Sequence, residues 1–241
     1  MADTTVISEL GTILSFWAHP DDETFSCAGI MAAAVKNGQR VVCVTATRGE
    51  KGVQDELRWP AERLADIRSQ ELMNALRILG VKEHHFLQYA DGECHKVPLE
   101  EGTAIARQFI DDIQPDSILT FASDGMTGHL DHQSVSAWVQ AAVKDLAEPP
   151  RVFYCAPLRS VYEQYMKELD EQFNIFFNVK EPRLVEPSDC DLCFSCDNEL
   201  CALKCAALKA MPSQTEALLK ATTPNQQRGM LSIESFSSKP A

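Results

Sequence analysis

The chain has 241 residues, of which 45% are hydrophobic and 24% charged, and its formal net charge is −13 at pH 7. This composition suits an α/β protein with a sizeable core and excludes a wholly disordered chain. An acidic surface with no compensating cluster of lysine or arginine repels phosphate backbones, so we expect no nucleic-acid partner.

Strands and helices are predicted to alternate along the first two thirds of the sequence. Short apolar runs predict strands at Gly11–Ala18, Arg40–Thr47, His85–Leu87, Asp116–Ala122 and Arg151–Cys155. Helical spacing of apolar residues predicts helices at Phe25–Lys36, from Pro60 to Gly80, at Glu100–Ile113 and at Asp131–Leu146, with a loop at 48–59. This alternation predicts a Rossmann-like α/β fold, a mostly parallel sheet with helices on both faces.

The last third is less regular. The sequence predicts helices at Tyr162–Leu169 and Glu199–Ala210 and strands at Asn174–Val179 and Asp191–Ser195. Residues from about 222 to 241 are rich in Ser, Thr, Pro and Gln and are interpreted as a surface tail. No internal repeat or linker is evident, so residues 1–241 are expected to form a single domain.

Ionisable residues gather directly after the first predicted strand, in the run Ala18-His19-Pro20-Asp21-Asp22-Glu23. Carboxylates favour helix N-termini, so these alone could simply cap the next helix. A second polar run, from Gly125 to His132, follows the fourth predicted strand. In a doubly wound sheet of order 3-2-1-4 the first and fourth strands are neighbours, and their carboxyl ends flank the point where ligands bind.

The two runs together would bring three imidazoles and four carboxylates into one crevice. Burying so many polar and charged groups without a counter-ion is too unfavourable, which predicts a divalent metal at the carboxyl ends of the first and fourth strands. A set of His and Asp ligands suits Zn²⁺ with one open position, while Fe²⁺ or another divalent metal stays an alternative. The remaining carboxylate and imidazole can act as general base and oxyanion stabiliser, so the residues indicate metal-assisted hydrolysis.

At these segments the sequence resembles the LmbE-like, or PIG-L-type, de-N-acetylase family, whose hallmarks are an (A/P)HPDDE motif and a later HxDH motif. Both are intact here, as Ala18–Glu23 and His129–His132. Weaker matches extend the resemblance over nearly the whole chain. They are Thr47–Glu50, Arg68–Glu71 with Leu79–Val81, Asp91-Gly92, Lys204 with Ser213-Gln214, and Ile233–Phe236.

The resemblance implies a role for each matching residue. His19, Asp22 and His132 would bind the metal. Asp21 would be the general base, His129 would stabilise the oxyanion, and Asp131 would orient His129.

The resemblance further implies that Glu50 and Arg68 contact the substrate, a small acylated amino sugar of the N-acetylglucosamine type. The expected reaction is hydrolysis of its carbon–nitrogen amide bond. A non-sugar amide, such as a thiol conjugate or an acylated peptide, is the alternative substrate. Family members often form homo-oligomers, and the resemblance implies that assembly here as well.

Five cysteines, Cys190, Cys193, Cys196, Cys201 and Cys205, support a rival interpretation, a metal-binding or redox-sensing protein. However, Cys193 and Cys196 would point to opposite faces of the predicted strand, and Cys201 and Cys205 fit a buried helical stripe. A second metal site is therefore not our main prediction.

The sequence begins without the basic region and apolar run of a secretory signal, and its apolar stretches fall well short of the roughly 18 to 20 residues that span a bilayer. Without export, the nine cysteines would stay reduced. We therefore expect a cytoplasmic protein with no integral membrane association.

Overall fold

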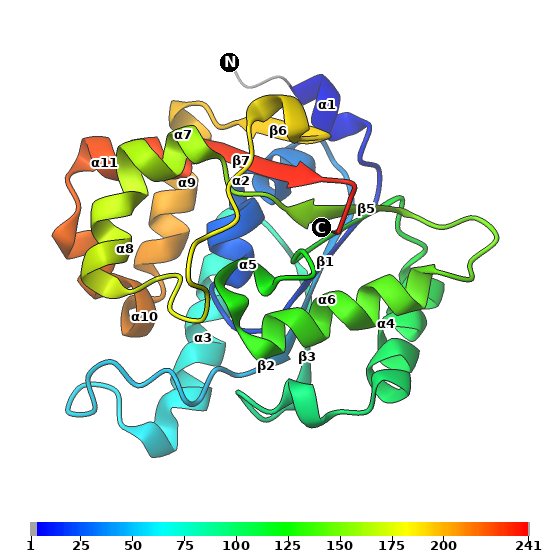
Figure 1. Ribbon diagram of the computed structural model, residues 1–241, viewed down its shortest axis with the longest axis horizontal. Coiled ribbons are helices and arrows are strands. Elements are labelled where there is room, and N and C mark those ends of the chain that lie inside the picture. The colour runs from blue at the N-terminus through cyan, green and yellow to red at the C-terminus, as the bar shows by residue number, and fades with distance from the viewer. Residues whose placement is uncertain (1–3, 241) are drawn as a thin grey trace.

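A seven-stranded sheet forms the centre of the protein. The computed structural model describes residues 4–240 (Figure 1). The strands are β1 (Ile13–Trp17), β2 (Val41–Thr47), β3 (Glu83–Tyr89), β4 (Ser117–Thr120), β5 (Arg151–Cys155), β6 (Leu192–Ser195) and β7 (Ile233–Ser237). Their order is β3-β2-β1-β4-β5-β7-β6, which confirms the predicted order 3-2-1-4. The strands from β1 to β5 pair in parallel, and β7 runs antiparallel to both of its neighbours.

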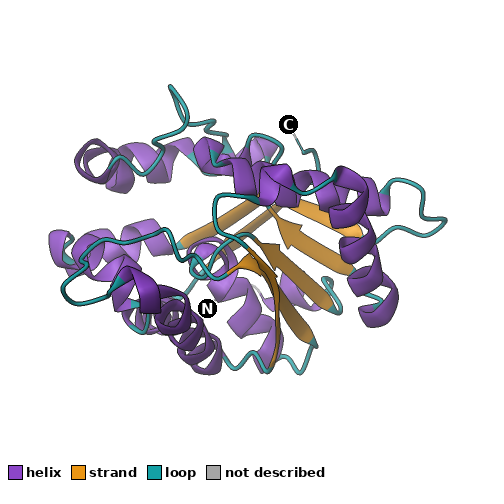
Figure 2. Cartoon of the chain, turned by 90° about the horizontal axis from the view of Figure 1, so that it is seen from below, coloured by secondary structure: helices purple, strands orange, loops and turns teal. Residues whose placement is uncertain are grey.

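Helices cover both faces of the sheet, as Figure 2 shows from below. They are α1 (Thr4–Ser8), α2 (Asp22–Lys36), α3 (Ala61–Leu79), α4 (Leu99–Ile113), α5 (Gly125–Gly128), α6 (Leu130–Val143), α7 (Arg159–Val161), α8 (Lys167–Phe173), α9 (Asn198–Lys209), α10 (Pro212–Ala221) and α11 (Pro224–Leu231). Shorter turns are η1 (Cys94–Lys96), the π-helical η2 (Tyr162–Met166) and η3 (Pro187–Asp189). Helix α9 packs against α2 and α3, and α4 packs against α6. The predicted α/β class is confirmed.

Strand β1 occupies the middle of the parallel part of the sheet. All five of its residues are buried, as a strand covered by helices on both faces requires. Ile13 pairs with Val41 of β2 on one side and with Ser117 of β4 on the other. The connections from β1 and β4 therefore leave the sheet side by side, at the edge where strand order reverses.

Helix α2 starts directly after β1 and bends at Cys27, whose backbone (φ −144°, ψ 19°) is not helical. A bend leaves amide groups of the following turn without intrahelical acceptors. The carboxylate of Glu234 on β7 accepts those of Gly29 and Ile30, both at 2.8 Å. The last strand of the chain thus stabilises the helix that follows the first.

Two predictions for the last third are wrong. Residues 174–179 (NIFFNV) are not a strand, because Asn174 takes a left-handed conformation (φ 52°) that ends α8, and the chain then turns. Residues 222–241 are not simply a surface tail, since they include α11 and β7, and Phe236 of β7 is fully buried. The alternation of apolar and polar residues in Ile233–Ser237 is the pattern of a strand, but it is too short to stand out in a polar sequence.

Within residues 4–240, no helix combines the length and apolar character needed to cross a membrane. The nine cysteines are all free thiols.

Candidate active site

The turn between β1 and α2 carries the first group of site residues. The backbone N–H of His19 donates to Asp22 Oδ2 at 2.7 Å, which fixes the carboxylate at the start of α2. Asp21, between them, has φ 111°, a conformation that costs a non-glycine residue of order 1 to 3 kcal/mol. Such strain persists only where the surroundings enforce it, and it is concentrated at functional sites. The turn is therefore held in shape by its neighbours.

The second group lies at the start of α6. His129 is the N-cap residue of α6, and its Nδ1 accepts the backbone N–H of Asp131 at 3.1 Å. An Nδ1 that accepts a hydrogen bond leaves the ring proton of neutral His129 on Nε2. His132 is one turn further along, and its Nδ1 lies 2.9 Å from the carbonyl oxygen of Gly125, to which it can only donate. Neutral His132 therefore has its lone pair on Nε2.

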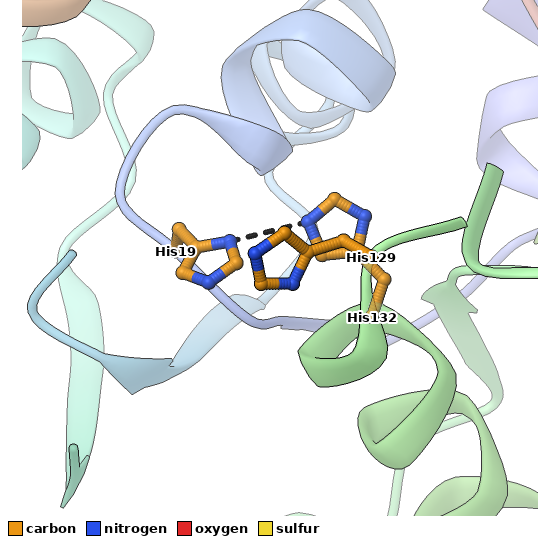
Figure 3. Close-up of side chains that lie close together, drawn as sticks. All are labelled: His19, His129 and His132. Atoms are coloured by element: carbon orange, nitrogen blue, oxygen red, sulfur yellow. Dashed lines mark hydrogen bonds between the residues drawn. The ribbon is translucent and has the colours of Figure 1, made fainter. Parts of the chain in front are cut away.

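The two groups meet although more than 100 residues separate them. His19 Nδ1 lies 3.1 Å from His132 Nε2. Asp22 completes the triangle, with one carboxylate oxygen 3.5 Å from His19 Nδ1 and the other 3.4 Å from His132 Nε2. Figure 3 shows the imidazoles of His129 and His132 pointing from the start of α6 toward His19. The predicted ligand residues His19, Asp22 and His132 are thus brought together.

These distances match what a metal ion requires. Tetrahedral zinc with ligands at 2.0 to 2.1 Å places neighbouring ligand atoms roughly 3.3 Å apart. His19 Nε2 faces two carboxylates, Asp91 Oδ1 at 3.1 Å and Asp131 Oδ2 at 3.2 Å, so its proton belongs on that nitrogen. Neutral His19 and neutral His132 would then aim lone pairs at each other across 3.1 Å. A proton or a cation must lie between them, and the residues fit a divalent metal.

Asp131 has a different contact from the predicted one. Its carboxylate faces His19 rather than His129, and it accepts backbone N–H groups from Gly92 at 2.7 Å and Cys94 at 3.0 Å. Only its own N–H reaches the His129 ring. The reason is that the start of α6 turns this side chain inward, where it is fully buried. Asp131 therefore orients His19 with its carboxylate and His129 with its backbone.

Asp91 was missed by sequence reasoning as a site residue. It is 5% exposed, pairs with His19 Nε2 and accepts the backbone N–H of Lys51 at 2.8 Å. A carboxylate behind a metal-binding imidazole fixes the ring and raises its basicity. The signal was present, because Asp91-Gly92 follows the third strand at the same edge of the sheet.

Burial and charge set the protonation of the site. Burial lowers the pKa of His132 to about 4, so this ring is neutral at neutral pH, as a metal ligand must be. Burial also opposes ionisation of Asp22, but the neighbouring imidazoles outweigh it and hold its pKa well below the ordinary range. Burial disfavours the charged form of His19 too, yet its carboxylate partners raise its pKa. Burial raises the pKa of Asp21 to about 7, and the nearby Arg68 limits the rise.

Arg68, for which the resemblance implies a substrate contact, supports the turn that carries Asp21. Its side chain is 5% exposed. It donates to the carbonyl oxygens of Gly49 at 2.7 Å and Pro20 at 2.6 Å and to Asp21 Oδ2 at 3.2 Å. Both terminal nitrogens of the guanidinium are thus engaged, while Nε has no hydrogen-bond partner, and Arg68 holds the strained turn between β1 and α2.

Glu50 is likewise engaged with the protein, since its carboxylate accepts the backbone N–H of Asp91 at 2.8 Å. A cavity of about 630 Å³ adjoins the site and has Asp22 and His132 in its wall, but neither Glu50 nor Arg68 lines it. Little in the sequence indicated the residues that do line the cavity, because most of them are apolar and belong to the irregular last third of the chain.

The cysteines do not form a metal cluster in the described part of the chain. Two groups of side chains there have ligand atoms that all lie within 4.8 Å of one another, His19/His129/His132 and His19/Asp91/Asp131, and neither contains a cysteine. Asp22 joins His19 and His132 through its separate oxygens, at 3.5 and 3.4 Å. Cys193 is exposed on β6, whereas Cys201 is buried on α9.

A protein-family model described as PIG-L, GlcNAc-PI de-N-acetylase, matches residues 14–143, more than half of the chain. The chain belongs to the PIG-L family. Both histidine-containing motifs fall within the matched segment of this family member. A 1D-myo-inositol 2-acetamido-2-deoxy-alpha-D-glucopyranoside deacetylase from Saccharopolyspora erythraea is 29% identical over 199 residues, which cover 70% of this chain and 66% of that protein. The chain spans about half to two thirds of the length of the curated relatives it matches.

Solved structures show the same PIG-L-type fold. The N,N'-diacetylchitobiose deacetylase of Pyrococcus horikoshii has a TM-score of 0.60 at 21% identity, over 96% of this chain and 85% of that one. The 4-carboxy-2-hydroxymuconate hydratase GalB of Pseudomonas putida KT2440 has a TM-score of 0.63 at 17% identity, over 94% and 95%. Because a deacetylase and a hydratase share the fold, the activity must be argued from the site.

Proposed function

We propose that this PIG-L family member is a metal-dependent hydrolase that removes an N-acetyl or other short acyl group from an amino-sugar derivative. The observation that carries the proposal is the approach of His19 Nδ1 to His132 Nε2 at 3.1 Å with the two oxygens of the Asp22 carboxylate beside them. Two imidazole nitrogens and a carboxylate at these distances fit a divalent cation, and the flanking groups are those that amide hydrolysis needs.

His19, Asp22 and His132 would hold the metal. When bound, a divalent cation makes water a usable nucleophile near neutral pH and polarises an amide carbonyl. Two imidazoles and one carboxylate suit zinc with a position left open. The same donors also suit ferrous iron, and we propose zinc as the first metal to test.

The other site residues would move protons and stabilise charge. Asp21 would take the proton of the attacking water and later return it to the leaving amine. The strained turn holds this carboxylate next to Asp22, and Arg68 fixes it from behind. His129, whose neutral ring carries its proton on Nε2, would donate to the oxygen that becomes negative during the attack.

The substrate class is supported by the names of the relatives. The family description and the name of the Saccharopolyspora erythraea relative both refer to removal of an acetyl group from a glucosamine linked to an inositol unit. A small-molecule amide of another kind is the alternative, because the catalytic groups act on the amide and not on the sugar.

The test combines metal analysis with an assay for free amine. We expect about one zinc per chain and release of acetate and amine from N-acetylglucosamine derivatives. Chelation should abolish the activity and added zinc should restore it. His132→Ala should lose both metal and activity, while His85→Ala, an exposed histidine on β3, should keep both. An active enzyme that retains no metal after chelation contradicts the proposal.

A second experiment separates the enzyme from a cysteine-based metal or redox protein. Metal content is compared between Cys193→Ser/Cys196→Ser and His19→Ala/His132→Ala. We expect metal loss in the histidine variant alone. Loss in the cysteine variant alone would favour the rival function.

A further inference from the structure

The cavity of about 630 Å³ beside the metal ligands is larger than an acetyl group needs. One part of its wall is Asp22 and His132, and the rest reaches η2 and helices α8, α10 and α11. Helices α8, α10 and α11 stand together at the left of Figure 1. A volume of this size is typical of pockets that bury most of a drug-sized ligand.

Most of the lining is apolar and follows Val143, where the family match ends. The side chains that form the far wall include Leu158, Met166, Phe173, Phe176, Leu218 and Met230. The π-helical turn η2 supplies Met166, and π-helical turns frequently occur at functional sites. We call this part of the cavity the apolar chamber. Its walls are particular to the last third of this chain, so they can differ between family members.

Ser26 Oγ is a buried cavity-lining atom without a hydrogen-bond partner, but other polar side chains in the walls already have partners. Tyr162 donates its hydroxyl to Asp170 at 2.7 Å, and Ser235 donates to the carbonyl oxygen of Ala156 at 2.7 Å. Glu234 accepts from Lys204 as well as from the two amides of α2. Sugar hydroxyls placed there would lose their hydrogen bonds to water and find few hydrogen-bond partners in the protein, which is unfavourable. An alkyl or aryl group would instead be stabilised by burial.

We propose that the substrate carries an extended apolar group, an alkyl chain or aromatic unit, that occupies the apolar chamber while the amide lies at the metal. The position of the amide rests on the proposed function. The apolar group can be attached on either side of the amide. It is then either part of a longer acyl group or part of the amine that is released.

The proposal predicts how much kcat/KM should change with the length of the apolar group. Burying one methylene contributes about 0.8 kcal/mol, which is about a fourfold change in an equilibrium or specificity constant. A series of substrates of increasing chain length should therefore show kcat/KM rising by up to about fourfold per methylene until the chamber is full. A substrate with only sugar and acetyl should be among the poorest.

The two attachments are distinguished by two series. One lengthens the acyl group of N-acyl-glucosamine from acetyl to decanoyl, and the other keeps the acetyl group and lengthens an alkyl chain on the amine side. We expect the steep rise in one series. A flat or falling kcat/KM in both series, with the acetyl compounds active, overturns the apolar chamber as a substrate site.

A variant pair tests the location. Leu218→Trp on α10 fills the chamber and should flatten the rise of kcat/KM with chain length in the steep series. Leu219→Trp is the matched control, since Leu219 is the next residue on the same helix and does not line the cavity. Circular dichroism and thermal unfolding check that both variants are folded. An unchanged slope in folded Leu218→Trp contradicts the proposal.

A binding experiment tests the apolar chamber independently of the proposed hydrolase activity. Calorimetry with linear carboxylates and primary amines of four to ten carbons should give a Kd that falls with chain length, together with a negative heat-capacity change. Length-dependent binding without hydrolysis of any amide would support the chamber and refute the function. Hydrolysis of an amide substrate, with binding that does not depend on chain length in either probe series, would support the function and refute the chamber.

Discussion

Lys204 on α9 and Glu234 on β7 form an ion pair inside the protein, and replacing Lys204 with methionine tests what it contributes. The Nζ–Oε1 distance is 2.7 Å, and the two side chains are 1% and 0% exposed. Burial opposes the charge on Lys204, but Glu234 outweighs burial and raises the pKa of Lys204, so its ammonium is charged at neutral pH. The same carboxylate accepts the amides of Gly29 and Ile30 where α2 bends.

Lys204→Met leaves the Glu234 carboxylate buried without its counter-charge. Breaking a buried pair in this way costs about 3 to 5 kcal/mol. For a chain of this size each kcal/mol lowers Tm by about 2 to 4 °C, so Tm should fall by roughly 6 to 20 °C. Glu234→Gln should be similarly destabilising, because it leaves a buried ammonium unpaired. The double variant has no buried charge and should cost only about 1 to 3 kcal/mol, for one amide without an acceptor.

The assay is guanidinium unfolding at pH 7, followed by circular dichroism, for the wild type, both single variants and the double variant. Lys36→Met is the matched control, since Lys36 and Glu199 also join α2 to α9 at 3.0 Å but are 67% and 65% exposed. It should change the free energy of unfolding by less than about 1 kcal/mol. Single-variant costs below that level, or costs that simply add in the double variant, would refute the reasoning.

Two further outcomes are expected. Asp91→Asn removes a charge behind His19 and should weaken metal binding by about 10- to 100-fold in competition with a chelator; equal affinity would show that Asp91 does not act on the ring. His84 lies 3.0 Å from Thr45 Oγ1, and burial lowers its pKa to about 4, whereas the unfolded chain has the ordinary value of 6.5. Its stabilising contribution is therefore complete above pH 6.5 and is lost as the pH falls toward 4. Urea unfolding should show that the free energy of unfolding falls less between pH 7 and pH 5 in His84→Gln than in the wild type, by on the order of 1 to 2 kcal/mol. An equal fall in both proteins would contradict this.

The parallel half of the fold could be predicted from sequence because its signals are local. The buried runs at β1 and β2 and the apolar spacing of α3 each reflect burial on a fixed face of a regular element. The approach of the motif after β1 to the motif at the start of α6 was also predictable, since the order of the strands brings those segments together.

The antiparallel end of the sheet could not be predicted in this way. Glu234 has an acidic side chain, yet it is buried in β7 because Lys204, 30 residues earlier in the chain, donates to it. Phe176 belongs to an apolar run that resembles a strand, yet Asn174 has turned the chain and the phenyl group lines the cavity. In both cases a distant partner decides the position, and no local pattern contains that information.

The sequence by itself determined the fold class, the order of the first four strands and the identity of the residues that meet at the candidate metal site. Periodic burial suffices for the fold class and strand order, whereas the particular metal-site residues were implied by the resemblance of the two histidine-containing motifs to a known family. Only the tertiary structure decided that Asp131 and Asp91 face His19, that Arg68 supports the turn after β1, and that an apolar chamber adjoins the ligands. Those features depend on where side chains from separate elements point, which is fixed by packing once the elements have come together.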